Sequence, residues 1–82
     1  MDDLIVEKYN YDAYAICDRN IYWGVFDIIM CFNLEEDNAI NYLSKYNYKI
    51  ARNADIMLFE NKEDALQVLE WINTLLIADQ LS

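Results

Sequence analysis

Two stretches of the chain place apolar residues at the three- and four-residue spacing of an amphipathic helix. The clearer one follows Asn61, a good N-cap, with Asp64 placed where its carboxylate can reach back to the start of the helix. Its apolar positions are Ala65, Val68, Leu69, Ile72, Leu75 and Leu76. We expect a helix over residues 62–77, followed by a frayed tail at residues 78–82.

The second helix is expected over residues 34–46. Asn33 can cap it, and Glu36 at the third helical position can complete a capping box. Acidic residues in the first turn also suit the positive end of the helix dipole. Asn47 can adopt the left-handed conformation that ends a helix. The apolar stripe consists of Ala39, Ile40, Leu43 and Tyr46.

Other apolar runs are typical of strands, because turn-forming residues separate them and β-branched and aromatic residues are common in them. A helix capped at Asn20 remains an alternative for the run at residues 21–32. The first run, within residues 1–12, suits a strand or an extended arm. Two tight turns are expected, at residues 18–20 and at Asn53-Ala54. The strand-like runs are at residues 4–11, 13–17, 21–32, 48–52 and 55–60.

These elements predict one compact α+β domain over residues 1–82, with an antiparallel sheet of about four strands and two amphipathic helices on one face. The chain is 56% hydrophobic with one Gly and no Pro, which disfavours disorder and linkers. Two apolar runs, Met30-Cys31-Phe32 and Met57-Leu58-Phe59, each precede an acidic pair and a helical stripe. This similarity suggests a pseudo-repeated ββα unit.

Charge is distributed unevenly along the chain, whose net charge is −9. The first 44 residues carry nine carboxylates against Lys8 and Arg19, whereas the remainder carries six against four cations. Such an acidic half favours a basic partner protein through steering and complementary potential. The few dispersed cations disfavour direct binding to nucleic acid and to anionic membranes.

The residue types present disfavour enzyme chemistry. The chain has no His, and neither of its two serines lies in a nucleophile elbow. Adjacent acids on a helix point about 100° apart, so Glu35, Glu36 and Asp37 cannot converge on a metal ion. We expect no catalytic residue, no metal and no cofactor. Cys17 and Cys31 are expected to be reduced, mostly buried thiols of a soluble, cytoplasmic protein, because the acidic N-terminus does not resemble a signal peptide.

Candidate contact residues are acids and aromatic residues interleaved in the N-terminal half. In strand geometry Trp23, Val25 and Asp27 would share an uncovered face, which would form an interaction surface. The alternatives are that Asp27 simply faces solvent and that the tyrosines cover a small core. The predicted partner-binding residues are Asp12, Asp18, Asp27, Tyr11, Tyr14, Tyr22 and Trp23.

The pattern as a whole favours a non-enzymatic inhibitor that occupies a basic site on a partner protein. In its sharper form this is a nucleic-acid mimic of anti-CRISPR or anti-restriction type, encoded by a phage or mobile element and acting in the host cytoplasm. One alternative is a structural or regulatory interaction module or homodimer that uses an apolar surface with Leu66, Trp71 and Trp23. Another is an immunity protein that neutralises a basic toxin.

Overall fold

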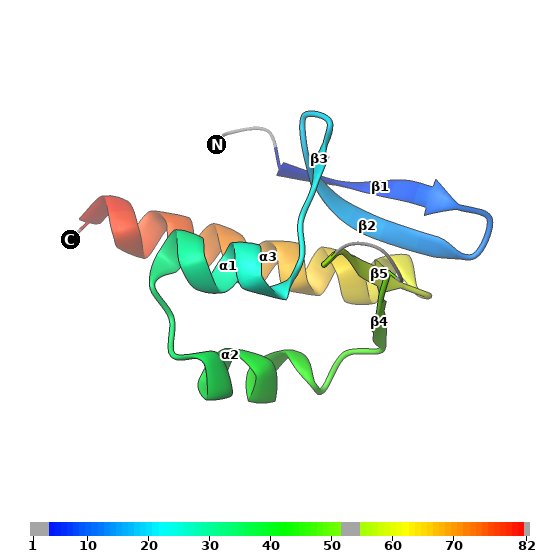
Figure 1. Ribbon diagram of the computed structural model, residues 1–82. Helices are drawn as coiled ribbons and strands as arrows, with labels where there is room; N and C mark the ends of the chain where they lie inside the picture. Colours follow the sequence, from blue (N-terminus) through cyan, green and yellow to red (C-terminus); the bar gives the residue numbers. More distant parts are fainter. Residues whose placement is uncertain (1–3, 52–54, 82) are drawn as a thin grey trace.

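A computed structural model describes residues 4–51 and 55–81, which form an α+β domain with an antiparallel five-stranded sheet and three helices (Figure 1). The predicted α+β class and antiparallel sheet are confirmed. No helix within these two ranges is long and apolar enough to cross a membrane. The elements are β1 (Leu4–Asn10), β2 (Ala13–Asp18), β3 (Ile21–Tyr22), α1 (Val25–Phe32), α2 (Glu36–Leu43), β4 (Tyr48–Ile50), β5 (Met57–Phe59) and α3 (Lys62–Leu81).

The sheet has the order β1-β2-β5-β4, and β3 pairs with β2 beside this path. Strands β1 and β2 form a hairpin whose register runs from Leu4 opposite Asp18 to Asn10 opposite Ala13. At the other end of β2, the turn into β3 contains Arg19 in the left-handed region, with φ of 62°. The N-terminal region therefore forms a strand, which was one of the two predicted alternatives; the other was an extended arm.

The centre of the sheet is held by a short contact between distant segments. Strands β2 and β5 pair at Tyr14 and Phe59. Beyond this pair Trp23 lies between the two strands: its N–H donates to the carbonyl of Ile16 at 2.8 Å, and its carbonyl accepts from the N–H of Met57 at 3.2 Å. On that side of the Tyr14–Phe59 pair, Trp23 therefore separates the two strands.

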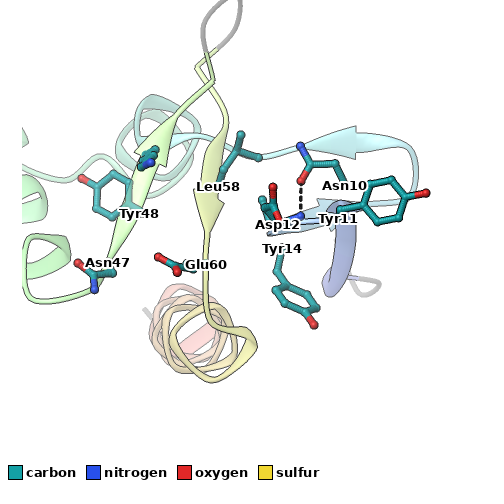
Figure 2. A pocket seen from close by; sticks show the side chains of 10 residues that line it. Asn10, Tyr11, Asp12, Tyr14, Asn47, Tyr48, Leu58 and Glu60 are labelled. Carbon is teal, nitrogen blue, oxygen red and sulfur yellow. Dashed lines mark hydrogen bonds between the residues drawn. The ribbon is translucent and has the colours of Figure 1, made fainter.

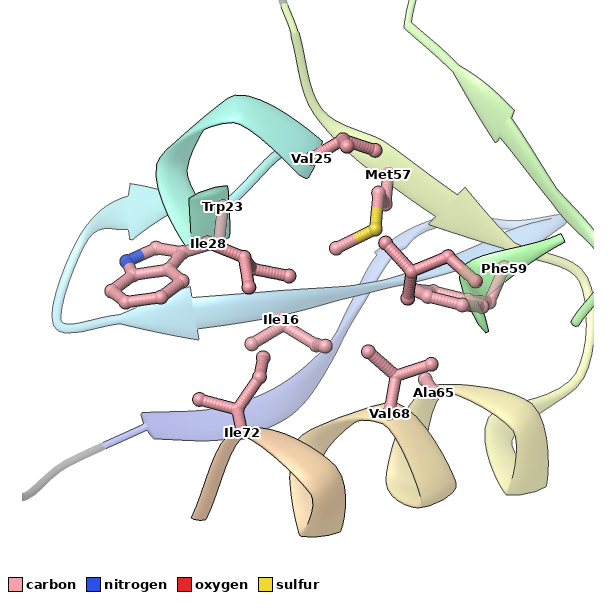
Figure 3. Close-up of a cluster of buried hydrophobic side chains, with 10 residues drawn as sticks. Ile16, Trp23, Val25, Ile28, Met57, Phe59, Ala65, Val68 and Ile72 are labelled. Atoms are coloured by element: carbon pink, nitrogen blue, oxygen red, sulfur yellow. The ribbon is translucent and has the colours of Figure 1, made fainter. Parts of the chain in front are cut away.

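The hydrophobic core lies where α3 crosses β1, β2 and β5, and α1 packs against α3 and α2 against α1. The stripe predicted for α3 supplies buried side chains to this core. Figure 3 shows Ile16 of β2 between Ile28 of α1 on one side and Val68 and Ile72 of α3 on the other. The core consists of Ile16, Trp23, Val25, Ile28, Leu43, Met57, Phe59, Ala65, Val68 and Ile72.

The segment at residues 21–32 was predicted as one long strand, with a helix capped at Asn20 as the alternative. It is a strand only at Ile21–Tyr22 and is helix α1 from Val25, with Gly24 rather than Asn20 as the N-cap. Its apolar residues recur at helical spacing, so a helix buries Val25 and Ile28 toward the core, and this packing outweighs the β propensity of the individual residues. The two apolar runs on which the predicted ββα repeat was based do not correspond in structure: one ends α1, whereas its counterpart forms β5.

Two carboxylates satisfy the backbone at the start of α1, which has Gly24 as its N-cap. Asp27 Oδ2 accepts the N–H of Gly24 at 2.6 Å, and Asp55 Oδ2 accepts the N–H of Phe26 at 3.0 Å. These are amides that a helix leaves without intrahelical partners, and they lie at the positive end of its dipole. Asp27 is thus a capping residue on a helix and does not share a strand face with Trp23.

The connection between α1 and α2 also differs from the prediction. Asn33 adopts a left-handed conformation with φ of 52° and ends α1, so it does not cap α2. Glu35 is the N-cap of α2, which is shorter than predicted: its last residue is Leu43, and Ser44 rather than Asn47 follows it. Helix α3 begins at Lys62 as predicted and continues beyond residue 77 to Leu81. The turn expected at residues 53–54 lies outside the described residues.

The cysteines differ in exposure, although neither forms a disulfide bond. Cys17 is buried, whereas Cys31 is exposed because α1 turns it outward, so the expectation of burial is wrong for Cys31. The Sγ of Cys17 donates to the carbonyl of Arg19 at 2.8 Å. Burial, followed by the nearby Glu7, raises the pKa of Cys17. Desolvation, followed by the carboxylates of Asp79 and Asp27, raises the pKa of Cys31.

We expect alkylation without reductant to label native protein once, at Cys31, and denatured protein twice. Because its pKa is raised, the labelling rate of Cys31 should keep increasing as the pH rises past the usual thiol value of 9.0. Intact-mass spectrometry over a time course measures both stages, and Cys31→Ser should remain unlabelled until denatured. Absence of labels on denatured protein would contradict the description of both thiols.

Candidate protein-binding site

A cleft of about 650 Å³ lies between the β1–β2 turn and the paired strands β4 and β5 (Figure 2). Strands β2 and β5 pair at Tyr14 and Phe59, and the cleft lies beside this pair, toward the β1–β2 turn. Its volume falls within the roughly 300–1,000 Å³ of ligand-binding pockets. We call it the tyrosine cleft, and it is lined by Asn10, Tyr11, Asp12, Ala13, Tyr14, Asn47, Tyr48, Lys49, Leu58 and Glu60.

On the hairpin side, the cleft is formed by consecutive residues of the β1–β2 turn and the start of β2. The side-chain oxygen of Asn10 accepts the N–H of Asp12 at 2.9 Å, which orders this turn. Tyr11 is 95% exposed and points outward at the rim, so its ring is available to a partner (Figure 2). Asp12 is exposed, whereas Tyr14 is half-buried and packs against the hydrophobic core.

On the opposite side, the cleft is formed by β4 and the end of β5. Tyr48 is half-buried, with its ring centroid 5.9 Å from that of Phe59. Burial, followed by the carboxylate of Asp55, raises the pKa of Tyr48, so its phenol is a neutral hydrogen-bond donor at physiological pH. Figure 2 shows Glu60 on the side of Tyr48, and Leu58 on the side of the hairpin. Residues on both sides of β5 therefore line the cleft.

Three of the seven predicted contact residues, Tyr11, Asp12 and Tyr14, come together at this cleft. Tyr22 lies elsewhere, opposite Cys17 on the sheet face away from Ile16, where its ring meets that of Tyr9 edge-on at 5.1 Å. Desolvation, followed by Glu7, raises the pKa of Tyr22.

The remaining three predicted contact residues have different positions again. Asp18 ends β2 at the far end of the hairpin, opposite Leu4. Trp23 is only 7% exposed and belongs to the core, so its ring offers little surface to a partner. Asp27 caps α1. The structure therefore does not gather the seven residues into one surface.

The residues of β4 and β5 were not anticipated as site residues. Tyr48 belongs to the tyrosine-rich composition, and Glu60 ends an apolar run, but neither has a local feature that marks a site. They reach the cleft only because β5 pairs with β2 across more than forty residues of sequence. This half of the site could have been identified only by knowing that β5 pairs with β2.

A smaller hollow of about 270 Å³ lies between α2 and α3. Here Tyr42 stacks on Trp71 with ring centroids 4.4 Å apart, and the Nζ of Lys45 lies 3.9 Å from the centroid of the Tyr42 ring. A hydrogen bond with Tyr42, followed by desolvation, raises the pKa of Tyr46. Tyr42 thus already has an aromatic and a cationic partner within the chain, which assigns this cluster to packing of α2.

The tyrosine cleft can bind a cationic group through the carboxylates of Asp12 and Glu60 and can donate hydrogen bonds from phenols. Among residues 4–51 and 55–81, no cluster of three His, Cys, Asp or Glu side chains could hold a metal ion. Comparison of the chain with protein-family models, with curated proteins and with solved structures found no match.

Proposed function

We propose that this protein is a non-enzymatic binding protein that engages a basic site on a partner protein through the tyrosine cleft and the adjoining end of the β1–β2 hairpin. The observation that supports this is that Tyr11, Asp12 and Tyr14 line the same open cleft as Tyr48 and Glu60. Tyrosine is enriched at protein interfaces because it combines a large apolar ring with a hydrogen-bonding tip.

The charge distribution supports the same function. Asp27 and Asp55 bond to the start of α1, and Glu36 and Asp37 lie in the first turn of α2, so these acids serve the helices. Asp12 has no such helix-start role, and its carboxylate is exposed beside the cleft. A net charge of −9 attracts a basic partner over several ångströms and raises its association rate.

In its sharper form, the protein is an inhibitor that takes the place of nucleic acid on a nucleic-acid-binding protein. Phages and mobile elements encode inhibitors of this kind against CRISPR and restriction systems. The support is the acidity of the chain and the exposed Tyr11 and Asp12 at the turn of the hairpin. An immunity protein directed at a basic toxin would use the same surface.

A second candidate function is an interaction module or homodimer that binds through apolar surface. Met30 on α1 is 79% exposed, and Ile77 and Leu81 on α3 are 57% and 83% exposed. Leu66 is 44% exposed, whereas Trp71 is half-buried against Tyr42. These side chains, rather than the buried Trp23, would form such an interface.

We expect the double variant Asp12→Asn/Glu60→Gln to weaken binding of the partner about tenfold at low salt, mainly through the association rate. The difference should shrink at 0.5 M salt because the charges are then screened. The partner is first recovered by affinity capture from the source organism, and binding is then measured by surface plasmon resonance. Both side chains are exposed, so the melting temperature should change little.

The matched control is Glu35→Gln/Glu36→Gln, which also removes two negative charges, at the start of α2, where the N-cap Glu35 makes no side-chain hydrogen bond to the helix. It should leave the affinity close to that of the original protein. Asp27→Asn is unsuitable as a test, because it would weaken the cap of α1. An unchanged affinity in the cleft variant, together with loss of binding in Met30→Ser, would contradict the proposal and favour the apolar interface.

A further inference from the structure

We infer that the group received by the tyrosine cleft is an arginine side chain of the partner, bound as a guanidinium in preference to a lysine ammonium. This inference rests on the proposed function and specifies the chemistry of the contact. It is carried by the combination of aromatic rings with hydrogen-bond acceptors around one cleft.

The rings favour a flat cation. Tyr14 and Tyr48 are half-buried on opposite sides of β5, and Tyr11 stands exposed at the rim. A guanidinium is planar and weakly hydrated, so it can lie against such rings at a small cost in lost hydration. An ammonium is compact and strongly hydrated, and it gains less from the same surface.

The acceptors also favour arginine. Residues with hydrogen-bond acceptors line the cleft from the hairpin (Asp12), from the start of β4 (Asn47) and from the end of β5 (Glu60). A guanidinium has five N–H donors in a fixed plane and can bond to a carboxylate through two of them at once, whereas an ammonium has three donors on one atom. The volume of about 650 Å³ accommodates a long side chain together with part of its backbone.

Lys49 supplies the positive charge within the cleft lining and provides a sensitive test of the inference. Its ammonium opposes any bound cation, so Lys49→Gln should increase affinity for an arginine probe. The side chain is exposed on the short strand β4, and the change removes no core contact. An increase in affinity cannot result from damage to the fold.

The probes are two acetylated, amidated pentapeptides, Gly-Arg-Gly-Arg-Gly and Gly-Lys-Gly-Lys-Gly, titrated into ¹⁵N-labelled protein at low salt. We expect the arginine peptide to shift amides at residues 10–14, 47–49 and 58–60 and to bind about fivefold more tightly than the lysine peptide. Asp12→Asn/Glu60→Gln should weaken its binding about tenfold, and Lys49→Gln should strengthen it about threefold. Glu36→Gln, distant from the cleft, should change nothing.

The outcomes separate this inference from the proposed function. Equal affinity for both peptides, or shifts spread over the acidic surface instead of the cleft, would overturn the guanidinium inference. The guanidinium inference is also overturned if neither peptide shifts the amide signals of the cleft residues while binding of the captured partner still depends on Asp12 and Glu60. In that case the proposed function stands. If the captured partner is indifferent to both cleft acids, the proposed function itself fails, whatever the peptides do.

Discussion

Replacing Gly24 with alanine is expected to lower the free energy of unfolding by about 3 kcal/mol or more, although only one methyl group is added. Gly24 is buried where the chain enters α1, and the segment that leads into β5 lies directly over it. A Cβ at this position would overlap the carbonyl oxygen of Asp55 and lie 2.7 Å from its Cγ. The backbone of Asp55 would have to move, and with it the carboxylate that bonds to Phe26.

The requirement at Gly24 is for space and not for an unusual backbone angle, since its φ of −115° is open to any residue. Gly24→Ser separates the two effects of substitution. Serine is a better N-cap than alanine, so a loss caused by capping alone would be restored by serine. If the overlap with Asp55 is the cause, serine should be nearly as destabilising as alanine.

Thermal unfolding followed by circular dichroism measures this effect. In a domain of this size, 3 kcal/mol corresponds to a fall of about 12–24 °C in melting temperature. A fall of only a few degrees in both variants would show that residues 24 and 55 are not in close contact.

The second large effect is expected at Phe59. Truncation of this residue to alanine should cost about 3–5 kcal/mol, as for other fully buried aromatic residues. Phe59 is 0% exposed and pairs with both Tyr14 and Tyr48, so it joins the hairpin to β4 at the centre of the sheet. The variant should also lose the tyrosine cleft, because the cleft is defined by the strands that Phe59 holds.

Urea denaturation gives the change in unfolding free energy for this variant. Leu58→Ala is the matched control: it truncates the adjacent residue of the same strand, which is only half-buried and points to the other face. It should cost about 1 kcal/mol. Similar losses in both variants would contradict the central role assigned to Phe59.

The local sequence pattern was sufficient to predict an element where that element is long or is bounded by a nearby turn. The first residue of α3 was predicted correctly from its apolar stripe, because apolar residues that recur at helical spacing without interruption fit only a helix. The hairpin-like junction at residues 18–20 was predicted from turn residues and is the turn between β2 and β3. For helix α1 the sequence left a strand and a helix open, because its seven apolar residues also fit a buried strand and one of its capping carboxylates, Asp55, lies 29 residues from the amide that it bonds to.

The candidate site divides in the same way. Its hairpin half could be identified from Tyr11, Asp12 and Tyr14, which are close in sequence. Its other half, with Tyr48 and Glu60, depends on which strand lies beside β2. Strand order depends on packing between segments far apart in the chain, and no local pattern reports it. The role of Asp27 was misassigned because helix and strand turn its carboxylate in different directions.

The position of Trp23 between Ile16 and Met57 has a consequence for the order in which the protein can form during synthesis. The apolar side chains that precede Cys31, including Ile28, have no β5 or α3 to cover them until residues 57–72 have been made. At a synthesis rate of about 5–20 residues per second, the time between the synthesis of Ile28 and that of residue 72 is about 2–9 s. During that interval apolar side chains of the future core are uncovered, and the high negative charge of the N-terminal half opposes its association with other acidic chains.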